Sequence, residues 1–441
     1  MLDLRRSAAQ ATLLFALLAS ALSAQYGGPS MLSRGGNSPG SRGRAPANLS
    51  WYGGTRAIYE SGLLQPQLNE EGELGPVNSL GIQVDGGLFG GHDWRRTSFG
   101  VDFRADYRHQ PALPALDGSN LALAFMVQHR LSRRVQVTSS VSAGTTNRAF
   151  GNFAVPVFGD PSRPGVPVTE LFDVRMYYGQ ADVGVAWRKS ARLTLQAGAG
   201  LFVIKRKSSN LYNAQGYSGV LGASYRTSSR TALTASYQYV SFRFPRVFSD
   251  SKVHGGSLGV QHRLTRSLEL NAYAGLFLAE ITGIERVRLS PELAEILGRP
   301  ESTTVFNRRA NAPNYTANLS WIQERGRAYI EAQSGVVPGN GVYLTSNRRS
   351  IRSGYSYVGL RRLSLGFSTG YATNSSMGLT LPGLSMWQAG GGLNYTVARR
   401  VHASAQYDYR TFETGATQAR SGSVISFGLT VSQSPFPLPL W

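Results

Sequence analysis

Apolar and polar residues alternate along most of the chain with a period of two. In residues 401–410, VHASAQYDYR, the odd-numbered positions are apolar or aromatic and the even-numbered positions are polar. Residues 97–109, 133–147 and 267–281 alternate in the same way. A period of two places successive side chains on opposite faces of an extended strand. The pattern therefore predicts strands that have one apolar and one polar face.

The length of these segments indicates which environment the apolar face meets. The clearest of them run over 9 to 15 residues, whereas strands of globular proteins typically have about 5–6 residues. A tilted strand needs about 9–11 residues to cross a bilayer. We find no helical stripe of apolar residues of comparable length. The segments therefore favour strands whose apolar faces contact lipid.

Two kinds of link alternate between the segments. Short links carry arginine between an aromatic residue or histidine and the next strand, as in HRLSRRVQV (129–137), WRKSARLTL (187–195), YRTSSRTAL (225–233), HRLTRSLEL (262–270) and YTVARRVHA (395–403). The other links are longer and variable, among them 149–176, 283–311 and 339–352. Short hairpin turns at one end and longer loops at the other predict an antiparallel, up-and-down arrangement.

The number of strands follows from counting back from residue 433. The pattern predicts 16 strands from residue 97 onward, including strands at 314–322 and 353–361, and two further candidates at 48–61 and 79–91. We prefer the total of 18 to the alternative of 16, because DWRRTSF (93–99) has the form of another arginine turn. Either even number leaves both ends of the barrel on the side of the short turns.

The N-terminal residues predict export. Residues 1–24 contain Arg5 and Arg6, an apolar run at 13–19 and then small residues, which is the layout of a secretory signal peptide. Residues 25–47 are rich in Gly, Ser, Pro and Arg, and this composition predicts a flexible segment. The predicted domain organisation is therefore a signal peptide (1–24), a flexible segment (25–47) and a barrel (48–441).

Composition excludes some partners. The formal net charge is +20, and since four of the 45 basic residues are lysines, 41 are arginines. Many of these arginines lie in the short turns, where they can contact lipid head groups. No basic cluster is interleaved with aromatic residues in the manner of a nucleic-acid-binding surface, so we expect no nucleic-acid partner. The absence of cysteine is compatible with an exported chain.

Taken together, residues 48–433 resemble a Gram-negative outer-membrane β-barrel of the porin-like size class. The segment RSGSVISF, with Arg420, Gly422, Ile425 and Phe427, matches the C-terminal assembly signal of such barrels, although the chain continues through a proline-containing tail to Trp441. The resemblance implies an all-β transmembrane barrel in the bacterial outer membrane, with outer-membrane lipids and the barrel-assembly machinery as partners. A soluble β-propeller also repeats at about 40 residues, but each of its blades holds four short strands.

A barrel of this size leaves an aqueous lumen. The sequence therefore favours a passive channel for small solutes, with a closed structural or surface-interaction barrel as the alternative. Charged residues on the polar faces would either stiffen the wall through ion pairs or set the selectivity of the pore. The candidate lumen-facing residues are Asp102, Arg104, Asp106, Arg108, Glu269, Glu331, His402, Asp408 and Arg410.

Signals of catalysis are weak, and a lipid-processing barrel enzyme is the least favoured interpretation. The six histidines have no spacing typical of a metal site, so we expect neither a metal nor a cofactor. The strings GGSLG (255–259) and GFSTG (366–370) lie inside predicted strands rather than at a strand-turn-helix elbow. His402 and Ser404 share one polar face, but their spacing on a single strand suits a wall better than a nucleophile and its base.

The link at 283–311 contains LSPELAEILGRP, which predicts a short helix capped by Ser290. Leu293, Ile296 and Leu297 would give this helix a small apolar face. It would pack either against neighbouring outer loops or against the inner wall. In the second case it forms a constriction loop, with Glu292 and Glu295 near arginines of the lumen. The sequence leaves both arrangements open.

Overall fold

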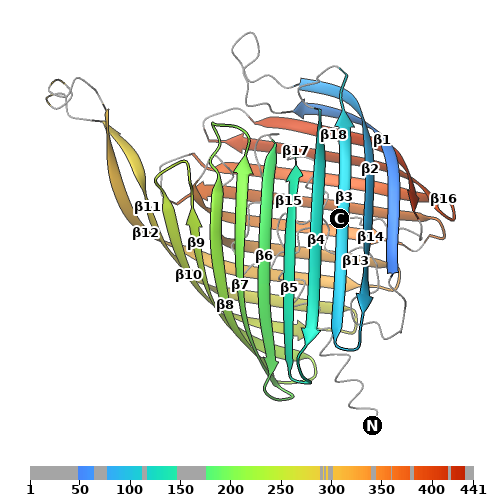
Figure 1. Ribbon diagram of the computed structural model, residues 1–441, viewed down its shortest axis with the longest axis horizontal. Coiled ribbons are helices and arrows are strands. Elements are labelled where there is room, and N and C mark those ends of the chain that lie inside the picture. Colours follow the sequence, from blue (N-terminus) through green and yellow to red (C-terminus); the bar gives the residue numbers. More distant parts are fainter. Residues whose placement is uncertain are drawn as a thin grey trace.

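The computed structural model describes residues 48–63, 77–111, 117–146, 175–288, 292, 295, 301–338, 344–358, 360–377, 382–415 and 419–432. In these residues one antiparallel sheet of 18 strands closes on itself through pairing of the first strand with the last (Figure 1). The strands are β1 (Asn48–Leu63), β2 (Val77–Asp93), β3 (Thr97–His109), β4 (Gly118–Arg130), β5 (Val135–Thr146), β6 (Met176–Arg188), β7 (Leu193–Arg206), β8 (Ala214–Arg226), β9 (Thr231–Arg243), β10 (Asp250–Arg263), β11 (Leu268–Arg288), β12 (Glu301–Ile322), β13 (Gly326–Pro338), β14 (Thr345–Tyr357), β15 (Leu363–Ser376), β16 (Leu384–Ala398), β17 (Val401–Thr414) and β18 (Arg420–Ser432).

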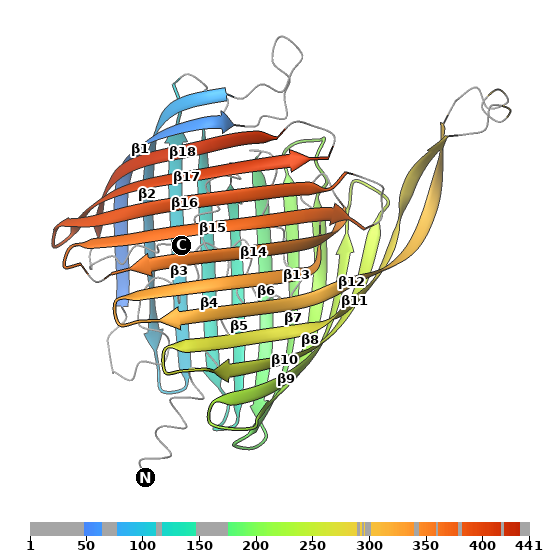
Figure 2. The ribbon, with the colours of Figure 1, turned by 180° about the vertical axis from the view of Figure 1, so that it is seen from behind.

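The strand count of 18 and the up-and-down order are confirmed, and the alternative of 16 strands is wrong. Each strand pairs with its neighbours in the sequence, so the chain winds once around the wall. Strands on opposite walls cross in the two views, as strands tilted against the barrel axis must do (Figures 1 and 2).

The short turns share a local cause. In four of them a hydroxyl oxygen accepts hydrogen bonds from two backbone N–H groups that follow it. Ser132 Oγ, for example, accepts from the N–H groups of Arg134 and Val135 at 3.1 and 3.0 Å. Ser190, Ser228 and Thr265 do the same in their own turns. The small polar residue at this position therefore closes the hairpin in these four turns.

The barrel is closed by a seam between β1 and β18. Their register runs from Tyr52 opposite Ser432 to Ser61 opposite Ser423. The hydroxyl groups of Ser61 and Ser423 lie 2.7 Å apart across this seam. Gly62 follows with a φ of 68°, and a side chain there would collide with the backbone of β18. Only glycine adopts this conformation and allows this approach without strain.

The predicted boundaries of three strands are wrong. β14 spans Thr345–Tyr357, whereas the sequence predicted a strand at 353–361 and a loop at 339–352. Charged and polar side chains occupy both faces of the first half of β14, so alternation did not reveal it. β11 and β12 also extend into the predicted loop at 283–311, through Arg288 and from Glu301 onward.

The extended parts of β11 and β12 form a hairpin that projects beyond the rim (Figure 1). The pairing of the two strands with each other continues to Arg288 and Glu301. The pairing of β11 with β10 already ends at Thr282, and that of β12 with β13 ends at Tyr315. Glu292 and Glu295 lie just past the end of this hairpin, both helical and exposed. The arrangement in which these glutamates meet arginines of the lumen stays a prediction.

The signal peptide (1–24), the flexible segment (25–47) and the tail after residue 432 lie outside the described residues, so those predictions stay predictions. Phe427, the aromatic residue of the proposed assembly signal, does not end its strand, because β18 continues to Ser432. Across the part of the chain that the structure describes, no helix is long and apolar enough to cross a membrane.

Candidate functional site: the inner wall of the barrel

The two faces of the wall differ sharply in chemistry. On β3, Phe103 and Tyr107 are 39% and 51% exposed, whereas Asp102 and Arg108, which flank them in the sequence, are 5% and 7% exposed. The same division continues around the barrel, with large apolar side chains exposed on one face of nearly every strand. All nine candidate lumen-facing residues lie on the opposite, inner face, and they are buried or partly buried.

A closed, even-numbered, antiparallel barrel with an apolar exterior, short turns at one rim and longer links at the other is the architecture of bacterial outer-membrane barrels. The inferred resemblance to this class, at porin size, is therefore confirmed at the level of fold. Many charged residues of the inner wall lie in two sectors, which differ in how their charges are balanced.

The first, which we call the paired sector, lies on β1–β4. Arg108 bridges to the carboxylate of Glu60, and a second guanidinium nitrogen donates to Gln83 Oε1 at 2.9 Å. Gln110 donates to the other oxygen of Glu60 at 2.5 Å. Glu60 is 1% exposed, so its charge is stabilised inside the wall by these donors.

The remaining acids of the paired sector also have close partners. Arg56 pairs with Asp85 at 2.9 Å, and Arg104 Nε donates to Asp102 at 2.9 Å. Asn120 donates to Asp106 at 2.7 Å. The sector therefore forms a lattice of neighbouring opposite charges on the inner wall. Sequence reasoning missed Arg56, Glu60 and Asp85, because the glycine-rich β1 and β2 show little alternation and the pairs depend on cross-strand register.

The second, which we call the arginine-rich sector, lies on β13–β17. Glu331 stands opposite Arg352 in the β13–β14 register, and both Arg348 and Arg352 are close enough to attract its carboxylate. Arg327, on the same face of β13, and Arg410, on β17, add to the positive charge. The only other acid that we assign to this sector among the described residues is Asp408.

Glycine on the neighbouring strand makes room for the side chain of Asp408. A Cβ at Gly390, which faces Asp408 in the β16–β17 register, would collide with that carboxylate. Asp408 also accepts a hydrogen bond from Gln406 at 2.6 Å. This sector therefore has a formal excess of positive charge, because it contains two acids and four arginines, Arg327, Arg348, Arg352 and Arg410.

The other predicted residues have structural contacts. Glu269 pairs with Arg263 at 2.9 Å beside the short turn that joins β10 and β11. His402 is buried, with Thr396 and Ser432 at 3.4 Å from its ring nitrogens. Ser404 directs its hydroxyl to the carbonyl of Gly428 at 3.5 Å. Over the described ranges, no group of three or more His, Asp or Glu residues is placed to hold a metal ion.

An apolar cluster occupies the inner face near the long-loop rim, and sequence reasoning did not predict it. Ser251 on β10 and Thr345 on β14 are joined there by a hydroxyl contact of 2.5 Å, although three strands separate them in the wall. The signals in the sequence are the loss of alternation in LFVI (201–204) and, in FRF (242–244), apolar residues at the positions that face inward. The cluster comprises Met176, Phe202, Ile204, Ala214, Val240, Phe242, Phe244, Val253, Phe277, Ala279, Ile281, Phe306, Ala312, Val336 and Leu344.

Comparison with solved structures finds outer-membrane proteins of Pseudomonas. The chain is similar to OccK2 (OpdF) of Pseudomonas aeruginosa, with 15% identity, a TM-score of 0.45, and coverage of 88% of this chain and 99% of that one. It is similar to the outer membrane protein OpdK of the same species, with 14% identity, a TM-score of 0.44, and coverage of 87% and 99%. A BenF-like porin from Pseudomonas fluorescens has 13% identity, a TM-score of 0.43, and coverage of 87% and 99%. No protein-family description and no curated protein sequence matches the chain.

Proposed function

We propose that the protein is a passive channel for small solutes in the bacterial outer membrane. The observation that carries this proposal is the closed wall of 18 strands, apolar outside and charged inside. A barrel of 16–18 strands is wide enough for an aqueous lumen. Charges inside a membrane-spanning wall are stabilised when they face water or one another.

The position in the membrane can be tested on two adjacent residues of β4. Leu123 lies on the exposed apolar face, and Ala124 lies on the inner face opposite Asp102. Arginine at position 123 places a charge in hydrocarbon, which costs about 2–4 kcal/mol near the midplane. We expect Leu123→Arg to block or weaken folding into vesicles and Ala124→Arg to be tolerated. Equal tolerance of the two variants would contradict this orientation in the membrane.

We further propose that the channel prefers anionic solutes. The paired sector holds its acids beside neighbouring donors, whereas the arginine-rich sector has more arginines than acids. Unbalanced positive charge on a pore wall raises the local concentration of anions and lowers their barrier to entry. Small carboxylates are the simplest solutes of this chemistry.

Planar-bilayer recording tests the channel and its preference separately. Discrete conductance steps would establish an open pore, and the reversal potential in a salt gradient would report anion or cation preference. Swelling of liposomes in a neutral sugar, compared with a carboxylate of similar size, gives the same comparison for solutes. Conductance without anion preference would refute the selectivity and leave the channel intact.

A closed barrel is the second candidate, and the inner apolar cluster favours it. Phe242, Phe277 and Ile281 are at most 1% exposed although they lie on the inner face. Side chains that line open water would not be buried in this way, so the lumen narrows at this level. A purified protein that shows the heat-modifiable migration of a folded barrel, yet gives no conductance, would establish the closed barrel over the channel.

A further inference from the structure

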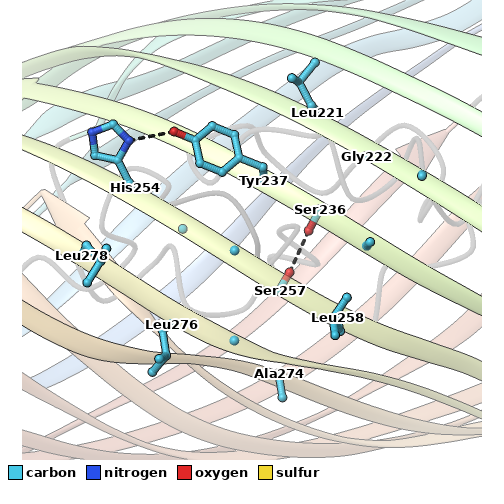
Figure 3. A pocket seen from close by; sticks show the side chains of 15 residues that line it. Leu221, Gly222, Ser236, Tyr237, His254, Ser257, Leu258, Ala274, Leu276 and Leu278 are labelled. Atoms are coloured by element: carbon cyan, nitrogen blue, oxygen red, sulfur yellow. Dashed lines mark hydrogen bonds between the residues drawn. The ribbon is translucent and has the colours of Figure 1, made fainter.

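A shallow depression lies on the exposed apolar face of β8–β11 (Figure 3). Its volume is about 840 Å3, within the range of about 300–1,000 Å3 that is usual for ligand sites. Leu221, Leu258, Leu276 and Leu278 surround it. Small residues form its floor, and a Cβ added to Gly256 would meet no atom within 4 Å. The depression is therefore an open groove lined mainly by aliphatic carbon.

The strand register shows which residues follow one another on this face from the groove toward the long-loop rim. Gly256 stands opposite Leu276 on β11 and Tyr237 on β9. Two residues closer to the rim, His254 stands opposite Leu278 and Tyr239. The groove is therefore bounded on the rim side by a layer of aromatic rings.

These rings are held together by direct contacts. Tyr237 Oη and His254 Nδ1 are 2.7 Å apart (Figure 3). The rings of Tyr239 and His254 have centroids 4.9 Å apart, and those of Tyr217 and Tyr239 lie 6.1 Å apart. Aromatic residues with a polar atom are favoured at the boundary between hydrocarbon and water. The aromatic layer therefore marks the level at which a lipid changes from acyl chain to head group.

Basic side chains follow in the next layers. Lys252 is two residues beyond His254 on the same face, and Arg243 lies one cross-strand layer further out, opposite Asp250. Lys205 is exposed on the same face at the end of β7. Three of the four lysines of the chain, at 205, 207 and 252, lie toward this end of the wall. The cations therefore gather directly above the aromatic layer.

Two acids are also present in these layers. Asp250 stands opposite Arg243, and Glu280 stands opposite Lys252. Glu280 is paired with Arg309 at 2.9 Å, so Arg309 balances its charge. The basic side chains here are Lys205, Arg243, Lys252 and Arg309, and the acids are Asp250 and Glu280. The surface therefore carries a formal excess of positive charge. The surface is therefore complementary to an amphiphile that carries a negatively charged head group.

We propose that this face binds a phosphate-bearing lipid of the leaflet next to the long loops. The groove is formed by Gly256 with Leu221, Tyr237, His254, Leu258 and Leu276, and Lys252 and Arg243 lie on its rim side. An acyl chain fills the groove, and the phosphate contacts the two cations and the tyrosine hydroxyls. The proposal rests on the membrane location given above and is independent of channel activity. The site would hold one specific lipid, in contrast to the lipid that surrounds the rest of the exterior without specific contacts.

The experiment is a native mass-spectrometry titration of the detergent-purified barrel with a diphosphorylated, multiply acylated disaccharide lipid or with phosphatidylcholine. We expect one retained phosphorylated lipid per barrel and much weaker retention of phosphatidylcholine. Lys252→Gln and Arg243→Gln should each weaken retention about fivefold, the effect of one cation near a membrane surface. Gly256→Leu should weaken it severalfold by filling the groove without changing charge.

Matched variants keep the test specific. Gly53 also lies on the exposed face, with its nearest atom 4.0 Å from an added Cβ, but on β1 rather than near the groove. Gly53→Leu and Lys189→Gln, in a short turn at the opposite rim, should leave retention unchanged. Retention that is unchanged in Gly256→Leu, or equal for the two lipids, would overturn the proposal. A dimer or trimer that Gly256→Leu dissociates would instead assign the groove to a second copy of the chain.

Failure of the site and failure of the membrane location are distinguishable. Each variant is first checked for heat-modifiable migration and for insertion into vesicles. A variant that inserts like the wild type but loses the phosphorylated lipid supports the site. A wild-type protein that does not insert would refute the membrane location itself.

Discussion

The paired sector on β1–β4 and the arginine-rich sector on β13–β17 are built from the same residue types, yet they balance charge differently. In the paired sector each acid lies within hydrogen-bonding distance of an arginine or an amide, as Glu60 does with Arg108 and Gln110. In the arginine-rich sector Glu331 is attracted by two arginines at once, Arg348 and Arg352. In the first arrangement four acids nearly balance three arginines, Arg56, Arg104 and Arg108, whereas the second keeps a formal excess of positive charge.

The difference teaches that charge on an inner wall has two separable effects. Closely paired charges contribute to the stability of the wall, because removing one partner leaves the other buried and uncompensated. Unbalanced charges contribute to the potential that a solute meets. Substitutions in the paired sector should therefore change stability, and substitutions in the arginine-rich sector should change ion selectivity.

The largest effect is expected in the paired sector. Arg108→Ala removes the charge partner of Glu60, which is 1% exposed, and breaking a buried pair costs about 3–5 kcal/mol. We expect a lower free energy of unfolding in urea, followed by electrophoretic mobility, with little change in ion selectivity. The double variant Glu60→Gln/Arg108→Ala should recover part of the loss. A large change in selectivity at constant stability would contradict the role of this pair in stabilising the wall.

The next effect is expected in the arginine-rich sector and is electrical. Arg348→Gln/Arg352→Gln removes two positive charges from the inner wall while keeping polar side chains there. The ratio of anion to cation permeability, obtained from the reversal potential, should fall severalfold. Arg349→Gln is the matched control, because Arg349 lies on the exposed outer face of the same strand. Equal effects of the inner and outer variants on the permeability ratio would contradict the proposal that this sector sets ion selectivity.

A smaller change of opposite sign is expected for Glu331. Glu331→Gln removes one of the acids that offset the arginines, so the preference for anions should increase. The shift in reversal potential should be smaller than that of the double arginine variant, because a single charge is changed. An unchanged reversal potential would show that Glu331 does not face the permeating ions.

The smallest effect is expected for Arg56→Gln in the paired sector. The side chain of Arg56 is 31% exposed in its pair with Asp85, and pairs open to water contribute about 0–1 kcal/mol. Unfolding in urea should change within this range, and selectivity should remain that of the wild type. A loss as large as that of Arg108→Ala would mean that burial does not govern the strength of these pairs.

The sequence was sufficient to predict the strands of the barrel wall, but not the contacts of the side chains on its inner face. Alternation and the arginine turns predicted 18 strands because lipid and lumen impose opposite chemistry on neighbouring residues. The same rule failed in the first half of β14, where both faces are polar, and beyond Thr282 on β11, where residues 283–288 do not alternate. In the second case the hairpin has left the wall, so neither face meets lipid.

The candidate site was only partly accessible from the sequence. Alternation placed Asp102, Arg108, Glu331 and Arg410 on the polar face of their strands. It could not show that Arg108 meets Glu60, because that contact depends on the relative register of β1, β2 and β3. The apolar cluster around Phe242 and Phe277 was missed for a related reason. Its residues come from many strands, and only the tertiary structure brings them together.

The seam between β1 and β18 sets the order of events when the protein is made. Ser61 and Ser423 meet across it at a sequence separation of 362, so the barrel cannot close until β18 has been exported. Bringing together ends so far apart is entropically costly and slow. Until then β1 presents an unpaired edge, and an unpaired edge pairs readily with other strands. During assembly, the free edge of β1 must therefore be shielded from other strands until β18 can pair with it.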